Sequence, residues 1–342
     1  TVNDIDLGSV LDAGTNDVSI KGRSGRSMSV GMDTSNDIQI DNTELANITA
    51  GSLTLVTENK DITVSGLETP DLLGINAETG LNLDTGSGDG DVSFVDTDSD
   101  LGVSLTASSG TGNFVASAGA STGDQQLSIT ANDFTIASTL DSGSAGTTLS
   151  VFDTDRHLDL AGGDQGDGAD ISGAELALIT ATDLTVRTKG SGGAIKTGSG
   201  ITDINTENIQ GTFKIASGGD FTSSTDAIST ASALSISAGG SVDLNGTVAA
   251  DDGFSSTGTT FDNTGGAITT AGSAIKIDHS GAVKVGGALS SGAGDVDIDS
   301  TGSTIALNNS IETTSGQVTI DASGKTSVAD AGDIMTEVGN VT

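Results

Sequence analysis

The sequence contains no Cys, no Trp and no Tyr, and Pro70 is its single proline. Without Cys the chain has no disulfide and no thiolate chemistry. Its aromatic residues are eight Phe, whereas a compact core normally uses many large aromatic side chains. These absences argue against ordinary globular domains in a chain of 342 residues.

Basic residues are also scarce, since 12 Lys and Arg stand against 47 Asp and Glu and the net charge is −35. Phosphate binding needs clustered Lys and Arg, so the charge excludes a nucleic-acid partner. No apolar run is long enough to span a bilayer, so we expect no membrane insertion. An acidic, Cys-free chain rich in Gly, Ser and Thr favours an extracellular or cell-surface location.

Apolar residues are nevertheless abundant, and they alternate with polar ones in short segments. Leu234–Ile236, Val283–Val285 and Val296–Ile298 each place two apolar side chains on one face of a strand. High charge and abundant Gly would suit a disordered chain. Because the alternation recurs along the whole sequence, we predict a folded, all-β protein instead.

The alternating segments form an internal repeat. One series recurs at nearly constant intervals and comprises Phe213, Leu234, Phe254, Ile275, Val296, Val318 and Val341. Each period holds three strand-like segments, as in AIKIDHSG, AVKVGG and ALSSGAG. Gly and Asn accept the positive φ of the sharp corners between such segments. The repeat predicts a parallel β-helix, or β-solenoid, with three sides and about 21 residues per coil.

We expect one continuous β-solenoid over residues 1–342, with regular coils over 211–342 and less regular coils with loops over 1–210. In the N-terminal half the strand-like segments often lie closer together, at roughly half the length of a coil. That spacing fits two-sided coils, or three-sided coils with one weak side, and the sequence does not decide between them.

The phenylalanines predict aromatic contacts inside the column, because equivalent positions of successive coils stack. Phe94, Phe114 and Phe134 are evenly spaced at close to one coil length, which predicts a ladder of three rings. Phe221 and Phe261 are separated by close to two coil lengths and should lie two coils from each other.

The coils resemble the β-helical repeat regions of filamentous-haemagglutinin-like exoproteins, the large adhesins of two-partner secretion and autotransporter passengers. The resemblance lies in coils such as AIKIDHSGAVKVGGALSSGAG and is best from Gly211 onward. It implies a right-handed parallel β-helix, export from a bacterial cell, and a role as shaft or adhesin. The secretion domain of that family is not recognisable in this sequence.

Catalytic residues are not expected. Nucleophilic catalysis needs a base beside the nucleophile, and His157 and His279 are the two histidines. We expect His279 to lie in a solvated turn at a coil corner, and His157 to pair with a nearby carboxylate of Asp153, Asp155 or Asp159. Polysaccharide hydrolases and lyases use aromatic platforms for sugar rings, and Trp and Tyr are absent. We therefore predict no enzyme and no required cofactor.

Calcium is the metal that the acidic segments favour, because Ca²⁺ binds carboxylate and carbonyl oxygens and Gly-rich turns expose carbonyls. The alternative is that these segments are solvated acidic loops. Asp295, Asp297 and Asp299 should face outward, and stacked like charges would repel one another, which is a second reason to expect bound cations. The candidate ligands are Asp89, Asp91, Asp96, Asp98, Asp100, Asp164, Asp167 and Asp170.

Lys21, Arg23 and Arg26 form the one basic cluster. We expect them to make local salt bridges, and the alternative is binding to the acidic surface of a neighbouring molecule.

The function that these features favour is structural: a rod segment of a secreted or cell-surface protein, in an adhesin shaft, a surface layer or an extracellular filament. The alternative is a ligand-binding adhesin whose loops contact cell-surface receptors of host or neighbouring cells. Ice binding is disfavoured because Thr-x-Thr does not recur at one coil position. Neither terminus carries a recognisable cap, so the expected partners are a second copy, stacked end to end or laterally, or the rest of a longer chain.

Overall fold

The structure is a computed structural model, and it describes residues 7–32, 36–162, 168–198, 204 and 206–342. Two compact units are present. Unit 1 comprises Thr1–Asp153 and Leu178–Leu184, and unit 2 comprises Thr154–Ala177 and Thr185–Thr342. The described strand pairs are parallel and the longest sheet has thirteen strands, which confirms the predicted parallel β-helix.

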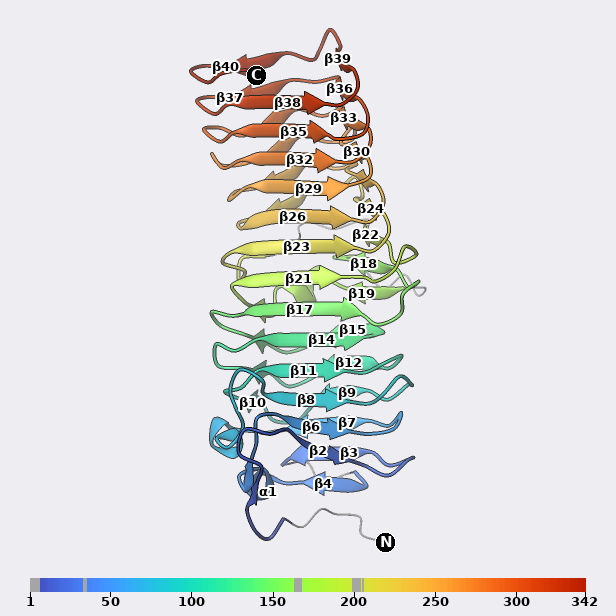
Figure 1. Cartoon of the computed structure of the whole chain (residues 1–342), viewed down its shortest axis with the longest axis vertical. Coiled ribbons are helices and arrows are strands. Elements are labelled where there is room, and N and C mark those ends of the chain that lie inside the picture. The colour runs from blue at the N-terminus through green and yellow to red at the C-terminus, as the bar shows by residue number, and fades with distance from the viewer. Residues whose placement is uncertain (1–6, 33–35, 163–167, 199–203, 205) are drawn as a thin grey trace. The chain divides into compact units, whose positions relative to one another are not determined.

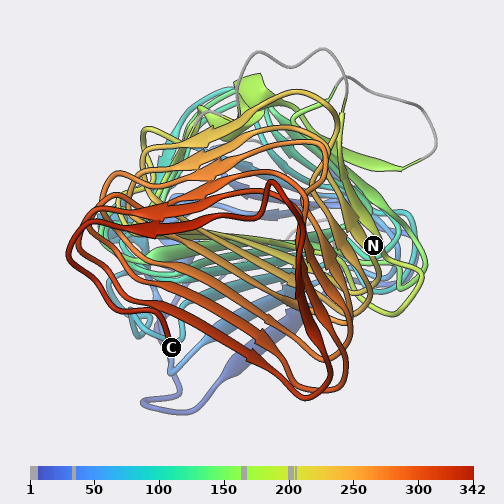
Figure 2. The same cartoon turned by 90° about the horizontal axis from the view of Figure 1, so that it is seen from above.

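In unit 2 each regular coil contributes one strand to each of three sheets. Figure 1 shows the strands of the longest sheet one above another: β23 (Thr212–Ser217), β26 (Ala233–Ala238), β29 (Phe254–Gly258), β32 (Ile275–His279), β35 (Val296–Ser300) and β38 (Val318–Ala322). The nine-stranded sheet has the order β19 (Ala169–Ile171), β18 (Leu158–Leu160), β22 (Ile195–Thr197), β24 (Phe221–Thr222), β27 (Val242–Asp243), β30 (Phe261–Asp262), β33 (Val283–Val285), β36 (Ile305–Leu307) and β39 (Thr326–Val328). The third sheet contains β25 (Ile228–Thr230), β28 (Val248–Ala250), β31 (Ile268–Thr269), β34 (Leu289–Ser290), β37 (Ile311–Thr313) and β40 (Ile334–Thr336). Seen from above, the orange and red coils trace a three-sided outline, as predicted (Figure 2).

The register of unit 2 is the one that the repeat predicted. The first inner residue of each strand in the longest sheet pairs with its equivalent one coil away, in the series Phe213, Leu234, Phe254, Ile275, Val296 and Val318. An isolated bridge from Val318 to Val341 continues it. Inner residues are buried because alternate positions of each strand point into the column, and one coil covers the next.

Buried hydroxyl groups form hydrogen bonds to backbone carbonyls at the corners between strands. In unit 2 the hydroxyl of Ser291 donates to the carbonyl of Gly294 at 2.6 Å, and that of Ser217 donates to the carbonyl of Asp220 at 2.7 Å. In unit 1 the hydroxyl of Ser142 donates to the carbonyl of Ala145 at 3.2 Å. These bonds add a side-chain donor to turn carbonyls, two of which, those of Asp220 and Ala145, also accept a backbone N–H from a neighbouring coil.

Unit 1 contains the same kind of coil in a less regular form. Its strands of the longest sheet are β2 (Val18–Lys21), β6 (Leu53–Val56), β8 (Leu81–Asp84), β11 (Leu105–Ser108), β14 (Leu127–Ala131) and β17 (Gly146–Val151), and β21 (Asp183–Arg187) spans the unit boundary. A six-stranded sheet has the order β15 (Asp133–Ile136), β12 (Asn113–Ala116), β9 (Val92–Phe94), β7 (Ile62–Ser65), β3 (Met28–Gly31) and β4 (Ile38–Ile40). The third side is built from β10 (Ser99–Asp100), β13 (Ala120–Ser121), β16 (Leu140–Asp141) and β20 (Ile179–Thr180), and from the pair β1 (Leu11–Asp12) and β5 (Ile48–Thr49).

The choice between two-sided and three-sided coils is therefore settled for β8 to β16, where each coil has three strands. The sides are uneven, since β10, β13 and β16 have two residues each. The chain also contains three single helical turns among the described residues: α1 (Asn42–Leu45), the 3₁₀ turn η1 (Thr69–Leu72) and α2 (Gly173–Leu176). No helix in the described part of the chain is long and apolar enough to cross a membrane.

The aromatic ladder is present only in part. Phe114 pairs with Phe134, but the coil that follows β9 brings Val92, and not Phe94, into register with Phe114. Phe94 pairs with Ala116 instead, and its ring contacts that of Phe114 diagonally at 6.0 Å and 48°. Phe221 and Phe261 do lie two coils apart in one row, with Val242 between them, as predicted.

Candidate functional site

A depression of about 440 Å³ lies on the third side of unit 1, and we call it the acidic recess. Its base is formed by β10, β13 and β16, which stack side by side. One wall is the start of η1 with Leu67, Glu68, Thr69 and Pro70. The other lining residues are Asp98, Ser99, Asp100, Gly119, Ala120, Ser121, Thr139 and Asp141.

The recess lies where η1 stands beside the two-residue strands β10, β13 and β16. Pro70 occupies the first turn of η1, where its missing N–H costs no hydrogen bond. The Asp71 carboxylate accepts from the N–H of Glu68 at 2.8 Å, and Leu72 anchors the turn in the core. The turn therefore forms one wall, and the short strands form the floor beside it.

The lining of the recess is acidic and rich in hydroxyl groups. Glu68, Asp98, Asp100 and Asp141 contribute carboxylates, and the lining contains no Lys, Arg or His. The Asp98 carboxylate accepts from the N–H of Gly119 at 2.6 Å, which fixes it against the next coil. Such a surface matches a cationic group or a hydroxyl-bearing ligand by charge and hydrogen bonding.

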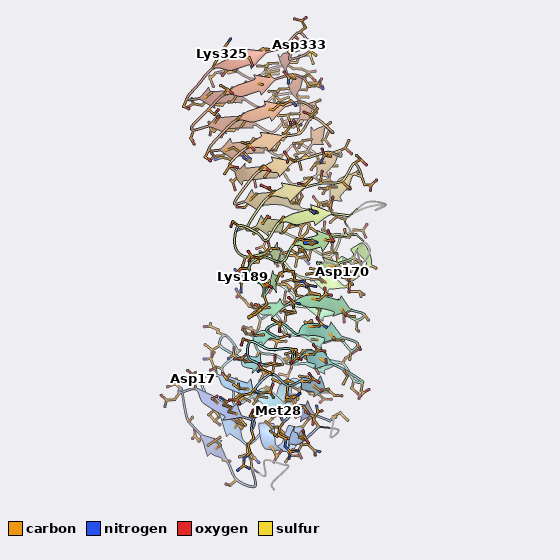
Figure 3. The ribbon with its side chains drawn as sticks, turned by 90° about the vertical axis from the view of Figure 1, so that its right-hand side faces the viewer. Asp17, Met28, Asp170, Lys189, Lys325 and Asp333 are labelled. Atoms are coloured by element: carbon orange, nitrogen blue, oxygen red, sulfur yellow. The ribbon has the colours of Figure 1, made fainter. Side chains whose placement is uncertain are left out.

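The predicted calcium ligands are distributed over separate places. Asp98 and Asp100 line the recess, and Asp96 occupies the turn before them with φ of 60°. Asp164 and Asp167 lie outside the described residues. Asp170 belongs to unit 2, in β19 beside Asp159 of β18, and it lies at the opposite edge of the ribbon from Lys189 in Figure 3.

Asp89 and Asp91 lie at another corner of unit 1. The Asp91 carboxylate accepts from the N–H of Asn113 at 2.7 Å, and its own N–H donates to Asp61 at 3.0 Å. Partial burial raises the pKa of Asp91, and the nearby carboxylates of Asp61 and Asp89 raise it further. Among the described residues no three His, Asp or Glu side chains gather in a group that could hold a metal ion, and calcium binding stays a prediction.

The two histidines have different surroundings. His157 lies 3.8 Å from the carboxylate of Asp159, which confirms the expected local pairing. The expectation for His279 is wrong, because it lies inside the column at the end of β32 with 0% of its surface exposed. The alternation Ile275, Ile277, His279 carries this signal, since all three residues share one face of the strand.

His279 also forms a serine–histidine hydrogen bond. Its Nε2 lies 3.0 Å from the hydroxyl of Ser256, the spacing of a nucleophile and its base. Both side chains are buried in the column, with 1% of Ser256 exposed, so a substrate has no access to the pair in this structure. The pair is a feature of the core.

Two of the three residues in the basic cluster make the local salt bridges that we expected. Lys21 lies 2.8 Å from Glu58 and Arg26 lies 2.7 Å from Asp37. Both pairs are at least partly exposed and each joins different segments of the first coils. The Lys21 ammonium lowers the pKa of Glu58 through its hydrogen bond and its charge.

Sequence reasoning missed Glu68 and Asp141 as members of the recess, and it missed the helical turns. In α1 the Asp41 carboxylate accepts from the N–H of Glu44 at 2.9 Å, and Glu44 accepts from the N–H of Asp41 at 2.9 Å. Ser172 and Glu175 form the same reciprocal pair at α2. A polar residue followed three positions later by an acidic residue and then Leu is the signal that could have revealed these turns.

Comparison of the chain with protein-family models, with curated proteins and with solved structures finds no match.

Proposed function

We propose that this chain is a non-catalytic structural segment of a secreted or cell-surface protein, serving as a spacer or sheath in an adhesin shaft, a surface layer or an extracellular filament. The observation that carries the proposal is the regular register from β23 to β40, where coil after coil repeats the same three strands. A stack of this kind gains length by adding coils, since each coil contacts only its neighbours. It suits a role in which distance and stiffness matter.

The chemistry of the surface supports export. A net charge of −35 keeps a long stack hydrated and repels other copies at high density. The chain also has no Cys that an oxidising compartment would convert to a disulfide. We propose an extracellular or cell-surface location on these grounds, together with the resemblance of the coils to exported β-helical adhesins.

Negative-stain images of the native material test the structural role. We expect the images to show ordered filaments, sheaths or lattices. Fibre diffraction of the same material should show the strand spacing of roughly 4.8 Å along the stack. Isolated particles in solution, without any ordered assembly on the cell of origin, would contradict the structural proposal.

The acidic recess favours a second candidate, a ligand-binding adhesin. Its carboxylates and hydroxyls lie on an accessible side of unit 1, where a receptor could reach them. Binding of the labelled chain to cells tests this, with Asp98→Asn combined with Asp141→Asn as the variant. Outward Asp297→Asn in unit 2 is the control, because it removes a carboxylate charge away from the recess. Loss of binding in the recess variant alone would favour the adhesin.

We further propose that the last coil pairs with another coil, either of a second copy or of the same longer protein. Strands β39 and β40 form the edges of their sheets, and the bridge from Val318 to Val341 extends the longest sheet beyond β38. Apolar side chains are exposed there, namely Val328, Met335, Val338 and Val341. Unpaired edges promote strand pairing, and charge on an edge opposes it. Val338→Lys should therefore reduce concentration-dependent association in sedimentation velocity, whereas Leu73→Lys, an exposed apolar residue away from the edge, should not.

A further inference from the structure

His279 is a large polar side chain in a row of small ones. Its neighbours in the sheet ladder are Gly258 on one side and Ser300 on the other. A Cβ atom at Gly258 would stand 3.2 Å from Cε1 of His279, so the imidazole uses the space that this glycine leaves. The ring is fully buried, and the ring of Phe261 packs against it at 5.4 Å.

Within the described part of the chain the imidazole has one hydrogen-bond partner. Nε2 lies 3.0 Å from the Ser256 hydroxyl, while Nδ1 is buried without a partner. The Ser300 hydroxyl, which belongs to the adjacent residue of the ladder on β35, donates instead to the carbonyl of Gly281 at 2.6 Å. A protonated imidazole carries two N–H donors and a positive charge, and the second donor would find no acceptor in this packing.

Among the residues that the structure describes, no carboxylate faces the imidazole inside the column. On β29 the chain from Phe254 to Gly258 contains no charged residue. The titratable and charged residues of the other strands around it alternate with buried ones and therefore face outward: Lys276 and Asp278 on β32, Asp297 and Asp299 on β35, Asp262 on β30 and Lys284 on β33. Burial lowers the pKa of His279 from 6.5 to about 4, and the charge of Asp278 only partly opposes this.

We propose that His279 makes this part of the solenoid acid-sensitive: protonation of the buried imidazole opens the coils that contain β29, β32 and β35. At neutral pH the uncharged ring fills the column. In acid the ring gains a proton once the coils separate and water reaches it, so acid favours the open form.

The direction follows from proton linkage. The unfolded or opened segment binds a proton near the ordinary pKa of 6.5, whereas the closed segment binds one only near 4. The contribution of His279 to the stability of the closed coils is therefore fully present above the ordinary pKa of 6.5, and it falls as the pH drops from 6.5 toward 4. Between about pH 7.5 and about pH 4.5 the equilibrium constant for opening should rise roughly 70-fold from this residue alone.

Hydrogen exchange of the full chain, read by mass spectrometry as protection factors, tests the proposal. Peptides covering β29, β32 and β35 should lose protection at the lower pH, and His279→Gln, which does not titrate, should abolish that loss. Peptides covering β11 and β14 of unit 1 serve as an internal reference, because those strands contain no histidine. Equal losses in the wild type and in His279→Gln would overturn the proposal and assign the effect to carboxylates. Absence of loss in the wild type would overturn it too.

A second measurement does not depend on the folding of a His279 variant. In His157→Gln the one remaining imidazole belongs to His279, so its ¹⁵N chemical shifts report its protonation directly. We expect the ring to stay neutral well below pH 6.5 and to gain its proton near pH 4, whereas protection of the same coils already falls between pH 6.5 and 4 because the open form binds the proton first. Protonation near the ordinary value while the coils stay protected would overturn the proposal.

Discussion

The strands of the longest sheet bury similar side chains in the two units but present different outer faces. In unit 1 the outer rows are uncharged hydroxyls over three successive coils, with Thr106, Ser128 and Thr148 in one row. In unit 2 the outer rows are charged, with Asp278, Asp299 and Asp321 at successive coils. Inner positions must fill a shared column, whereas outer positions meet water. The comparison shows that the stack dictates the inside and leaves the outside free to vary.

The outer rows also differ in their electrostatics. Partial burial raises the pKa of Asp299, and the neighbouring carboxylates of Asp297, Asp278 and Asp321 raise it further, while Lys276 opposes them. The hydroxyl rows of unit 1 have no such repulsion. If the inside alone carries the stability, changes to the outer rows of either unit should have small effects, and changes to inner rows should have large effects in both.

The largest effect is expected from a charge in an inner row. Val296→Asp in unit 2 and Ile129→Asp in unit 1 each bury an unpaired carboxylate at a position with 0% exposure. Each should lower the free energy of unfolding by about 4 kcal/mol or unfold the surrounding coils, measured by urea denaturation. The outward neighbour Asp297→Asn is the control and should be nearly neutral. Equal effects of Val296→Asp and Asp297→Asn would refute the assignment of inside and outside.

A smaller effect is expected at the corner hydroxyls. Ser291→Ala in unit 2 and Ser142→Ala in unit 1 each remove a buried hydroxyl and its hydrogen bond to a turn carbonyl, which should cost about 1 kcal/mol. Ser290→Ala removes a hydroxyl from the adjacent outward position and is the matched control. Thermal unfolding followed by circular dichroism measures the difference. A cost in only one of the two units would show that the corners are not equivalent.

Removing one carboxylate from the outer row of unit 2 should raise stability slightly. Because the pKa of Asp299 is raised in the folded chain, its ionisation disfavours folding, and the penalty appears as pH rises through and above the ordinary Asp value. Asp299→Asn should therefore gain about 0.3 kcal/mol at neutral pH after screening by solvent. Thr130→Val at the corresponding face of unit 1 is the control, because it changes no charge. A gain for Asp299→Asn that persists undiminished in high salt would speak against repulsion as its cause.

The smallest effect is expected from calcium. If the predicted carboxylates bind Ca²⁺, low millimolar Ca²⁺ should raise the melting temperature more than NaCl of matched ionic strength does, because NaCl acts only by screening. An equal gain with the two salts would leave screening as the cause. If Asp98→Asn removed that extra gain and Asp297→Asn did not, the site would lie in the acidic recess.

Several features followed from local patterns alone. The alternation around Leu234, Ile275 and Val296 determined which residues face inward, because side chains of a strand alternate between its faces. The regular period of the repeat determined the parallel pairing of unit 2. The scarcity of basic residues determined the acidic surface. These properties depend on neighbours in the sequence, and any chain with this pattern would share them.

Only the tertiary structure decided the features that depend on the exact length of each coil and on which coils lie together. The longer coil after β9 moved Phe94 out of the predicted ladder, because extra residues in a corner shift a register without changing the alternation. The acidic recess needed η1 and three later coils in contact, and it joins Glu68 to Asp141, which lie far apart in the sequence. The burial of His279 came from its place beside Gly258, and only the stacking of one coil on the next turned that histidine into a core residue.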